Sequence, residues 1–291
     1  MGQPAVSVIV PSYNSATYLP RALQSLIDQT LDPHEIEIIV VDDGSSDDIA
    51  RAIAPYEARI RLIRIEHAGV SAARNAGIST ATGRYVTFLD ADDVWLPERL
   101  EAVLALALSE NDTLCSTDFY YETDGVRSAE PEFQRRGMLS LFRETARVQY
   151  RTALVGNFLP YCQLLRRDIL GRIGAFDTSL SYGEDYDLWL RCLKAGIPAR
   201  VDERPLAIYR FMRPGASTTR NDVKKAADRV TVLERRRRDV PTWRWAEATG
   251  YLNHVRLRDA IQQRRYAEVV SSSFALARNP RYVEKWIRSH L

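Results

Sequence analysis

Short apolar runs alternate with helix-spaced segments through the first 108 residues, and this alternation limits the possible folds most. The runs that we expect to form strands are Val6–Val10, Ile36–Val41, Arg61–Ile65 and Tyr85–Leu89. The segments that we expect to form helices are 19–29, 47–56, 71–81 and 96–108, the last with Pro97 at an early helical position. Strands that alternate with helices predict βαβ units and an α/β fold, with a mixed, mainly parallel sheet flanked by helices.

Three of these strands end in polar clusters: Pro11-Ser-Tyr-Asn14, Asp42-Asp-Gly-Ser45 and Asp90-Ala-Asp-Asp93. Ligands bind beyond the carboxyl ends of the strands in open parallel sheets. We therefore expect the three clusters to converge on one crevice.

The pattern is looser after residue 111. We expect a hairpin near 120–126 with Asp124-Gly125 as its turn, a helix at 184–195, a strand at 201–209 and a loop at 213–219. Helical patterns follow at 223–238, 245–263, 266–278 and 281–289. The interpretation is a catalytic domain over residues 1–219 and a basic helical C-terminal extension over 220–291.

Composition excludes several classes of protein. Of 291 residues, 45% are hydrophobic and 27% charged, which is typical of a globular chain and not of a disordered one. The three cysteines are far apart, so we expect reduced thiols rather than disulfides or a metal site. With no apolar run long enough for a signal peptide or a membrane span, a cytoplasmic location is expected.

Charge is distributed unevenly along the chain. From Arg220 to the end there are seventeen Lys or Arg and eight Asp or Glu, although the whole chain carries only +2. The run Arg235-Arg-Arg-Arg238 could contact anionic lipid headgroups, or it could be a solvated helix end. No motif for nucleic-acid binding is present, so we expect none.

The acidic run Phe88-Leu-Asp-Ala-Asp-Asp93 suggests a metal site. Three carboxylates within four positions repel one another, and a Mg²⁺ or Mn²⁺ ion shared with substrate phosphates would remove that repulsion. An acidic turn that caps the next helix is an equally open interpretation of this run alone.

Three other motifs each have two interpretations. Asp42 could bind a nucleotide, or Asp42-Asp-Gly-Ser45 could be a simple turn. The segment Ala68–Gly77 could place Arg74 and Asn75 near a diphosphate, or it could be a small-residue helix packed on the sheet. The acids of Gly183-Glu-Asp-Tyr-Asp187 could supply a general base, or they could complement a helix dipole.

Taken in order, these motifs closely resemble glycosyltransferase family 2 over about residues 5–215. The motifs that carry the resemblance are Val8-Ile-Val-Pro-Ser-Tyr-Asn14, Val40-Val-Asp-Asp-Gly-Ser45, Gly69-Val-Ser-Ala-Ala-Arg-Asn-Ala-Gly77, Phe88-Leu-Asp-Ala-Asp-Asp93 and Gly183-Glu-Asp-Tyr-Asp-Leu-Trp189. The resemblance implies the A-type glycosyltransferase fold and transfer of a sugar from a nucleoside diphosphate, with UDP favoured.

Site residues follow from the resemblance position by position. It implies Asp185 as the catalytic base and Asp92 as the ligand of a Mn²⁺ or Mg²⁺ ion. Matches to its nucleotide-sugar-binding positions are Pro11, Tyr13, Asp42, Arg74, Asn75 and Asp90. Residues in supporting positions are Glu184, Asp93 and Trp189.

One departure from the family concerns the segment that follows the last predicted strand. Relatives often have Tyr-Arg-x-His after the last strand, whereas this chain has Tyr209-Arg-Phe-Met without histidine. Arg210 or Arg213 is the candidate to contact the diphosphate instead.

The resemblance also implies an inverting displacement onto a glycan or a lipid-linked acceptor, as in bacterial surface polysaccharide synthesis. A non-catalytic nucleotide-sugar binder is an alternative, and a sugar nucleotidyltransferase is a weaker one because no glycine-rich basic loop follows the first strand. A dinucleotide dehydrogenase is disfavoured because Gly-x-Gly-x-x-Gly is absent there. The donor sugar, the acceptor and the oligomeric state are not predicted.

Overall fold

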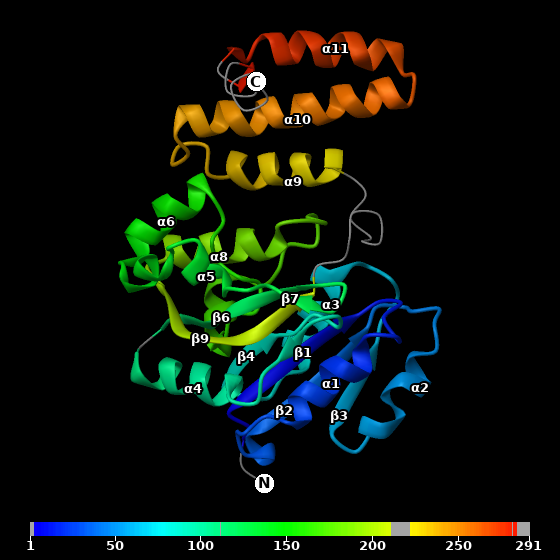
Figure 1. Cartoon of the computed structure of the whole chain (residues 1–291), viewed down its shortest axis with the longest axis vertical. Coiled ribbons are helices and arrows are strands. Elements are labelled where there is room, and N and C mark those ends of the chain that lie inside the picture. Colours follow the sequence, from blue (N-terminus) through cyan, green and yellow to red (C-terminus); the bar gives the residue numbers. More distant parts are fainter. Residues whose placement is uncertain (1–2, 111, 211–221, 281, 284–291) are drawn as a thin grey trace.

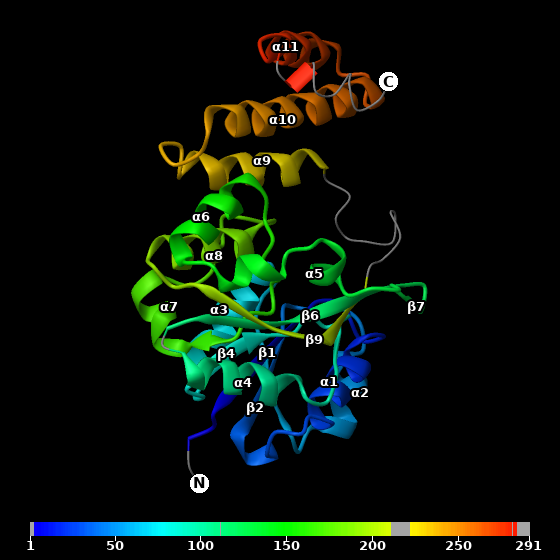
Figure 2. The same ribbon diagram turned by 60° about the vertical axis from the view of Figure 1, so that its left-hand side comes forward.

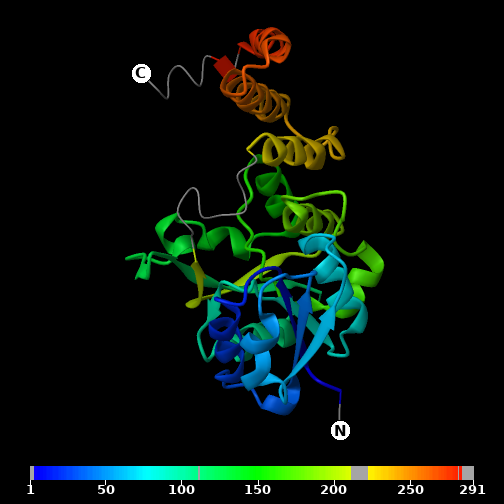
Figure 3. The same ribbon diagram turned by 90° about the vertical axis from the view of Figure 1, so that its right-hand side faces the viewer.

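The computed structural model describes residues 3–110, 112–210, 222–280 and 282–283. The described chain has an α/β body, built from residues up to Arg210, and a stack of three C-terminal helices beyond it. The stack projects from the body on the side away from the N-terminus, as Figure 1 and the rotated views in Figures 2 and 3 show.

The main sheet has five strands in the order β3-β2-β1-β4-β8. Its first four strands are parallel, and β8 pairs antiparallel with β4. The strands are β1 (Val6–Ser12), β2 (Ile36–Asp42), β3 (Ile60–Arg64), β4 (Tyr85–Phe88) and β8 (Leu165–Arg166). The prediction of a mainly parallel sheet is therefore confirmed. Every residue of β1 and β4 is buried, as expected for strands covered on both faces.

A second sheet of four strands has the order β5-β9-β6-β7. Its strands are β5 (Val94–Trp95), β6 (Leu114–Thr123), β7 (Val126–Arg127) and β9 (Ala199–Arg210). The two long strands β6 and β9 run parallel to each other, and β7 forms the predicted hairpin with β6. Asp124 and Gly125 both have positive φ, at 52° and 78°, as the tight turn between these strands requires.

The helices are α1 (Leu19–Ile27), α2 (Ile49–Ile53), α3 (Val70–Thr80), α4 (Arg99–Ser109), α5 (Glu132–Arg135), α6 (Ala146–Val155), α7 (Arg167–Ile173), α8 (Glu184–Lys194), α9 (Asp222–Glu234), α10 (Thr242–Gln262) and α11 (Tyr266–Ala277). Short 3₁₀ segments lie at Pro33–Glu35, Ala54–Tyr56 and Leu139–Arg143.

Two helix boundaries predicted in the α/β body are wrong. Helix α4 begins at Arg99, not at Leu96, because Val94 and Trp95 pair with β9 and the N–H of Leu96 donates to the carbonyl of Leu206. The strand β5 thus occupies Val94–Trp95, and a turn at Pro97 and Glu98 precedes the helix. The other helix, α2, ends at Ile53, and its continuation to Tyr56 is 3₁₀ rather than α-helical.

Helix α3 packs against β1 and β2 through small residues. A Cβ atom added at Gly77 would lie only 2.4 Å from Ile9 Cγ2, so the helix backbone approaches the sheet more closely than any other residue type permits. The packing interpretation of this segment is therefore confirmed. It does not exclude the functional interpretation, because Arg74 on the same helix lies at the strand ends.

The C-terminal helices are joined to the body by α9. Val232 and Leu233 belong to the main hydrophobic core, whereas Ala226 packs in a smaller cluster with Leu252 and Val255 of α10. The three helices predicted at 223–238, 245–263 and 266–278 are present, but the first ends at Glu234 and residues 235–238 form turns. The segment 281–289 lies largely outside the described residues. The division of the chain at residue 219 remains a prediction.

Several aromatic residues of this extension are exposed. The exposed fractions of Trp243, Tyr251 and Tyr266 are 46%, 43% and 76%. Within the described ranges, none of the helices combines the length and the apolar content that crossing a bilayer requires. The cysteines Cys115, Cys162 and Cys192 are free and buried.

Candidate active site

The strand register brings the predicted polar clusters to one edge of the main sheet. Ser12 at the end of β1 lies opposite Asp42 at the end of β2. Next to them, the N–H of Leu89 after β4 donates to the carbonyl of Ile9, which places Asp90 at the same edge. The predicted convergence of these clusters is therefore present in the fold.

Arg74 joins this edge to the second half of the chain. Its Nη2 lies 2.8 Å from Asp90 Oδ1, and its Nη1 lies 2.6 Å from Glu184 Oε1 at the start of α8. Only 3% of Arg74 is exposed. Burial lowers its pKa, but the charges of Asp90 and Glu184 outweigh that effect and keep the guanidinium protonated. One buried cation thus holds two carboxylates from segments far apart in sequence.

Asp185 follows Glu184 in the first turn of α8. Its Oδ1 accepts a hydrogen bond from the N–H of Tyr186 at 2.6 Å. Burial and the neighbouring charge of Glu184 raise its pKa to about 7, while Arg74 opposes the shift. A carboxylate whose pKa lies near neutrality is suited to accept a proton at physiological pH.

The members of the acidic run face different surroundings. Asp93 is buried, with Oδ2 accepting from the Tyr161 hydroxyl at 2.5 Å and Oδ1 accepting from the N–H of Arg210 at 2.8 Å. Burial and the charges of Asp92 and Asp90 raise the pKa of Asp93 well above its usual value. Asp93 therefore joins β9 and Tyr161 to the strand end, which is a structural role.

Asp92 is partly exposed, as is Asp90, whereas Asp93 is buried. Burial and the nearby charge of Asp90 raise its pKa to about 6, with Arg210 opposing the shift only weakly. Among the described residues there is no group of three or more acids, histidines or cysteines that could hold an ion alone. Two neighbouring carboxylates with excess negative charge still fit a divalent cation that completes its coordination with phosphate oxygens.

Asp42 is almost fully buried at the end of β2. Its Oδ1 accepts from the N–H of Ser45 at 2.9 Å, which is the turn that one interpretation predicted. Its Oδ2 lies 3.3 Å from Arg64 Nε but accepts no hydrogen bond from the described residues. A buried acceptor oxygen without a hydrogen-bond donor is a candidate contact for a ligand N–H or O–H.

A cleft of about 390 Å³ opens beside this edge of the sheet. The Tyr13 ring stacks on His67 with centroids 4.0 Å apart, and His67 Nδ1 lies 2.9 Å from Asp43 Oδ2. The residues that line the cleft are Pro11, Ser12, Tyr13, Asp43, His67, Gly69, Val70, Ala73, Ser181 and Tyr182.

A scan against family models matches residues 7–174 to glycosyl transferase family 2. The chain belongs to this family. The predicted membership is therefore confirmed, and with it the prediction of a glycosyltransferase at the level of the family.

Curated relatives include other members of the family. The protein WfaP of Escherichia coli, named UDP-Glc:alpha-D-GlcNAc-diphosphoundecaprenol beta-1,3-glucosyltransferase, is 31% identical over 238 residues, covering 79% of this chain and 85% of that protein. Glycosyltransferase RP339 of Rickettsia prowazekii is 32% identical over 65% of this chain, and putative glycosyltransferase EpsH of Bacillus subtilis is 41% identical over 43%. The chain spans only 58% of RP339 and 37% of EpsH.

Among solved structures, TarS 1–349 of S. aureus in complex with UDP-GlcNAc aligns with a TM-score of 0.64 over 98% of this chain and 92% of that chain. Sequence identity is 20%, so the likeness concerns the fold. It confirms the predicted A-type glycosyltransferase fold of this family 2 member, together with the α/β arrangement described above.

Asn75, which the resemblance implied for nucleotide contact, and Trp189, which it implied as a supporting residue, both contact other parts of the protein. The Asn75 amide donates to the carbonyl of Phe176 at 2.8 Å and accepts from its N–H at 3.0 Å, which fixes the segment before α8. Trp189 is fully buried, with its ring edge-on to Phe176. Both residues therefore contact Phe176 and hold the segment before α8 in place.

The two arginines proposed for the diphosphate have different outcomes. The Arg210 guanidinium lies over the Tyr18 ring at 5.3 Å, with Nη2 3.4 Å from Glu122 Oε1. It is therefore held beside β6, although its charge still reaches Asp92. Arg213 lies outside the described residues.

Sequence reasoning missed four groups of this family 2 site: His67, Tyr161, and Ser181 with Tyr182. His67 stands just after β3 and before the motif Ala68–Gly77, and this position at a strand end was the available signal. Tyr161 donates to Asp93 and also accepts from the N–H of Asp90 at 3.1 Å. No local pattern marks it, because its role depends on tertiary packing.

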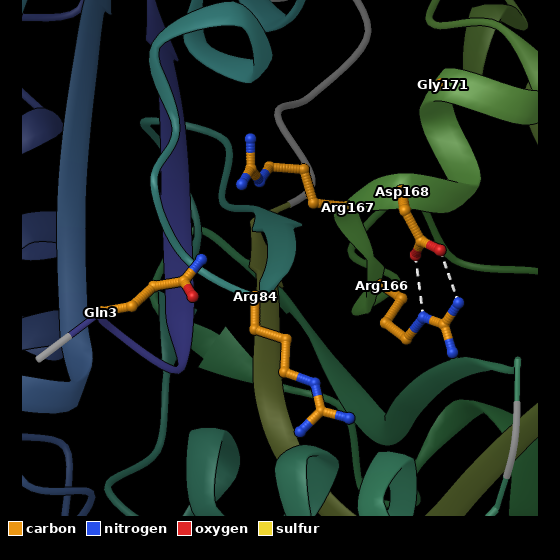
Figure 4. A pocket seen from close by; sticks show the side chains of 6 residues that line it. All are labelled: Gln3, Arg84, Arg166, Arg167, Asp168 and Gly171. Atoms are coloured by element: carbon orange, nitrogen blue, oxygen red, sulfur yellow. Dashed lines mark hydrogen bonds and ion pairs between the residues drawn. The ribbon is translucent and has the colours of Figure 1, made fainter.

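A larger hollow of about 520 Å³ lies away from this site, at the end of the sheet where β1 and β4 begin (Figure 4). It is lined by Gln3, Arg84, Arg166, Arg167, Asp168 and Gly171. Arg166 forms ion pairs with Asp168 at 2.5 Å and with Asp112 at 3.0 Å. The carboxylate in the hollow, Asp168, is thus ion-paired, and no acid from the family motifs lines the hollow. We therefore assign the hollow no part in the reaction.

Proposed function

We propose that this chain transfers a sugar from a nucleoside diphosphate sugar, with UDP favoured, to a hydroxyl group of a glycan or lipid-linked acceptor. The observation that carries the proposal is the pair of ion pairs that Arg74 forms with Asp90 and Glu184. They hold Asp90, at the carboxyl end of the sheet, in the same crevice as Glu184 and the adjacent Asp185. WfaP is named for a UDP-Glc donor and a diphosphoundecaprenol-linked acceptor, and TarS has structures with UDP and UDP-GlcNAc, which supports this substrate class.

The donor would lie along the carboxyl ends of the strands. Tyr13 offers an exposed ring, 43% accessible, for stacking with the base, and Pro11 lines the same cleft. Asp42 Oδ2, which accepts no hydrogen bond from the described residues although Arg64 Nε lies 3.3 Å away, is the acceptor proposed for an N–H of the base. Asp90 would lie toward the ribose, with its orientation fixed by Arg74.

Asp92, supported by Asp90, would hold a Mn²⁺ or Mg²⁺ ion together with the diphosphate. When bound, such an ion supplies positive charge that stabilises the departing diphosphate. The raised pKa of Asp92 supports this assignment, since burial and the nearby charge of Asp90 both disfavour its charged form in the absence of a cation. Removal of divalent ions with EDTA should abolish transfer, and Mn²⁺ or Mg²⁺ should restore it. Full activity in EDTA would contradict the assignment.

Asp185 would act as the base in a single displacement. As the acceptor oxygen bonds to the anomeric carbon, the bond from that carbon to the diphosphate oxygen breaks, and its electron pair leaves with the diphosphate. The proton of the acceptor hydroxyl passes to Asp185. Attack from the face opposite the leaving group inverts the anomeric configuration.

The decisive measurement is release of UDP from a panel of UDP-sugars. The wild type should release UDP in the presence of acceptor, whereas Asp185→Asn should be slower by about 10²–10⁴-fold. The matched control is Asp168→Asn, an exposed acid far from the crevice, which should keep full activity. Donor binding with no turnover by the wild type would favour the alternative, a non-catalytic nucleotide-sugar binder.

The run Arg235–Arg238 does not offer a basic surface for membrane contact. Within Arg235–Arg238, Arg235 pairs with Asp177 and Arg236 is buried against Asp187, so the run is not a free basic patch. Tyr266, Val270 and Phe274, four residues apart along α11, instead form an apolar ridge with 57–76% of each residue exposed, and Ile261 near the end of α10 is 57% exposed. Arg264 and Arg278 are also exposed near the two ends of this ridge.

We propose that this ridge rests on an anionic lipid surface, because apolar side chains flanked by arginines match the interface of such a membrane. Vesicles that contain phosphatidylglycerol should pellet the wild type but not Phe274→Glu. Leu108→Glu, which alters an exposed apolar residue on α4, is the control and should pellet normally. Equal pelleting of all three proteins would refute the proposal.

A further inference from the structure

The loop before α8 depends on a helix of the C-terminal extension. Asp228 on α9 accepts hydrogen bonds through a single oxygen, Oδ2, from the N–H groups of Ser181 at 3.0 Å and Tyr182 at 3.1 Å. The amine of Lys225, one turn earlier on α9, lies 5.5 Å from the centre of the Tyr182 ring. Loop N–H groups require partners outside regular structure, and here a side chain of α9 supplies them.

This loop links two parts of the site. Ser181 and Tyr182 form one wall of the cleft that contains Tyr13. Gly183 follows with φ of +71°, a left-handed conformation, and the chain then enters α8 with Asp185 in its first turn. A shift of the loop would therefore move both the cleft wall and the proposed base.

Two arginines that follow α9 contact residues on either side of this loop. Arg235 lies 2.7 Å from Asp177 Oδ2, just before the loop. Arg236, only 7% exposed, donates to the Asp187 carbonyl at 3.0 Å and to its Oδ1 at 2.9 Å, inside the first turn of α8. The contacts of α9 and of the two arginines that follow it thus extend from Asp177 to Asp187.

We propose that Asp228 is a positioning residue for glycosyl transfer, through which the C-terminal extension fixes the cleft wall and the start of the catalytic helix. The inference rests on the proposed function, in that the cleft binds the donor and Asp185 acts as the base. It assigns the extension a part in catalysis that requires neither a membrane nor an acceptor.

The geometry of the Asp228 contact allows variants that keep the two hydrogen bonds to be compared with variants that lose them. Both N–H groups bond to one oxygen, so Asp228→Asn can keep the two hydrogen bonds through its amide oxygen, whereas Asp228→Ala cannot. Asp222→Ala is the matched control, because Asp222 lies on the same helix but pairs with Arg258 of α10. Arg235→Gln tests the second anchor if Asp228→Ala proves poorly folded.

The first measurement is hydrogen–deuterium exchange of the full-length proteins without ligand. Exchange of the amides at 179–184 should increase in Asp228→Ala, and it should match the wild type in Asp228→Asn and Asp222→Ala. Unchanged exchange in both Asp228→Ala and Arg235→Gln would overturn the proposal. Because this measurement needs no substrate, it reports on the loop even if the proposed function fails.

The second measurement is UDP affinity by calorimetry, together with kcat and KM for the UDP-sugar. Asp228→Ala should bind UDP about tenfold more weakly, and kcat should fall by about tenfold or more because small displacements of catalytic groups have large effects. Asp228→Asn should restore both values. A mobile loop with normal UDP affinity and normal kcat would refute the positioning role, whereas a wild type that binds no nucleotide would refute the proposed function instead.

Discussion

Replacing Arg74 with methionine should destabilise this protein strongly, and more so at high pH than at low pH. Arg74 is 3% exposed and pairs with Asp90 and Glu184 at 2.8 and 2.6 Å. Loss of the cation leaves two carboxylates, and Asp185 beside them, without compensation. Breaking a buried ion pair from one side costs about 3–5 kcal/mol. For a chain of this size, such a loss lowers the melting temperature by about 6–15 °C.

The pH dependence follows from the same cluster. Asp185 has a pKa of about 7 in the intact protein, where the charge of Arg74 lowers it, so removing Arg74 should raise the pKa of Asp185 further in the folded state. The cost is fully present above that pKa, and it shrinks as the pH falls through it because protonation removes the repulsion. Urea unfolding at pH 8 and pH 5.5 should therefore give a larger loss of stability at pH 8.

Arg21→Met is the matched control for this experiment. Arg21 also pairs with a glutamate, Glu122, at 2.7 Å, but its side chain is 45% exposed and Arg210 remains near the same acid. Its removal should cost at most about 1 kcal/mol at either pH. The reasoning is refuted if Arg74→Met costs no more than Arg21→Met, or if its cost is the same at both pH values.

Three further predictions test the base, the nucleotide contact and the packing. The transfer rate at saturating donor should rise with pH through about 7, as expected for a base with the pKa of Asp185, and a flat profile from pH 6 to 8 would contradict this. Asp42→Asn should weaken UDP binding by about 10–100-fold in calorimetry, since a hydrogen bond to a charged group is lost, and a change below about twofold would exclude the contact. Gly77→Ala should cost about 1–3 kcal/mol in urea unfolding because its Cβ would lie 2.4 Å from Ile9, whereas Gly171→Ala, with open space around it, should not destabilise.

The main sheet could be predicted because its information is local. Runs such as Val6–Val10 combine β-branched residues with complete burial, and the polar clusters after them mark the crevice without knowledge of the rest of the chain. The convergence of Asp42, Arg74, Asp90 and Asp185 then follows from parallel topology and the family motifs. Local patterns were sufficient wherever sequence neighbours are also spatial neighbours.

The parts that escaped prediction depend on distant partners. Val94 and Trp95 are extended rather than helical only because β9 lies beside them, more than a hundred residues later in the chain. Tyr161 has no motif of its own, yet it holds both Asp93 and the backbone of Asp90. In the sequence, Asp228 is an acid within a helix rich in Lys and Arg. Its contacts with the N–H groups of Ser181 and Tyr182 depend on the tertiary fold.

The parallel pairing of β6 with β9 has a consequence for how the polypeptide is produced. During synthesis β6 emerges long before Ala199–Arg210, so its hydrogen-bonding edge stays unpaired until β9 has left the ribosome. A fragment cut where the family match ends, at residue 174, would lack β9 and also α8 with Asp185. Such a fragment should aggregate, and expression designs for this protein should extend through α9 at least.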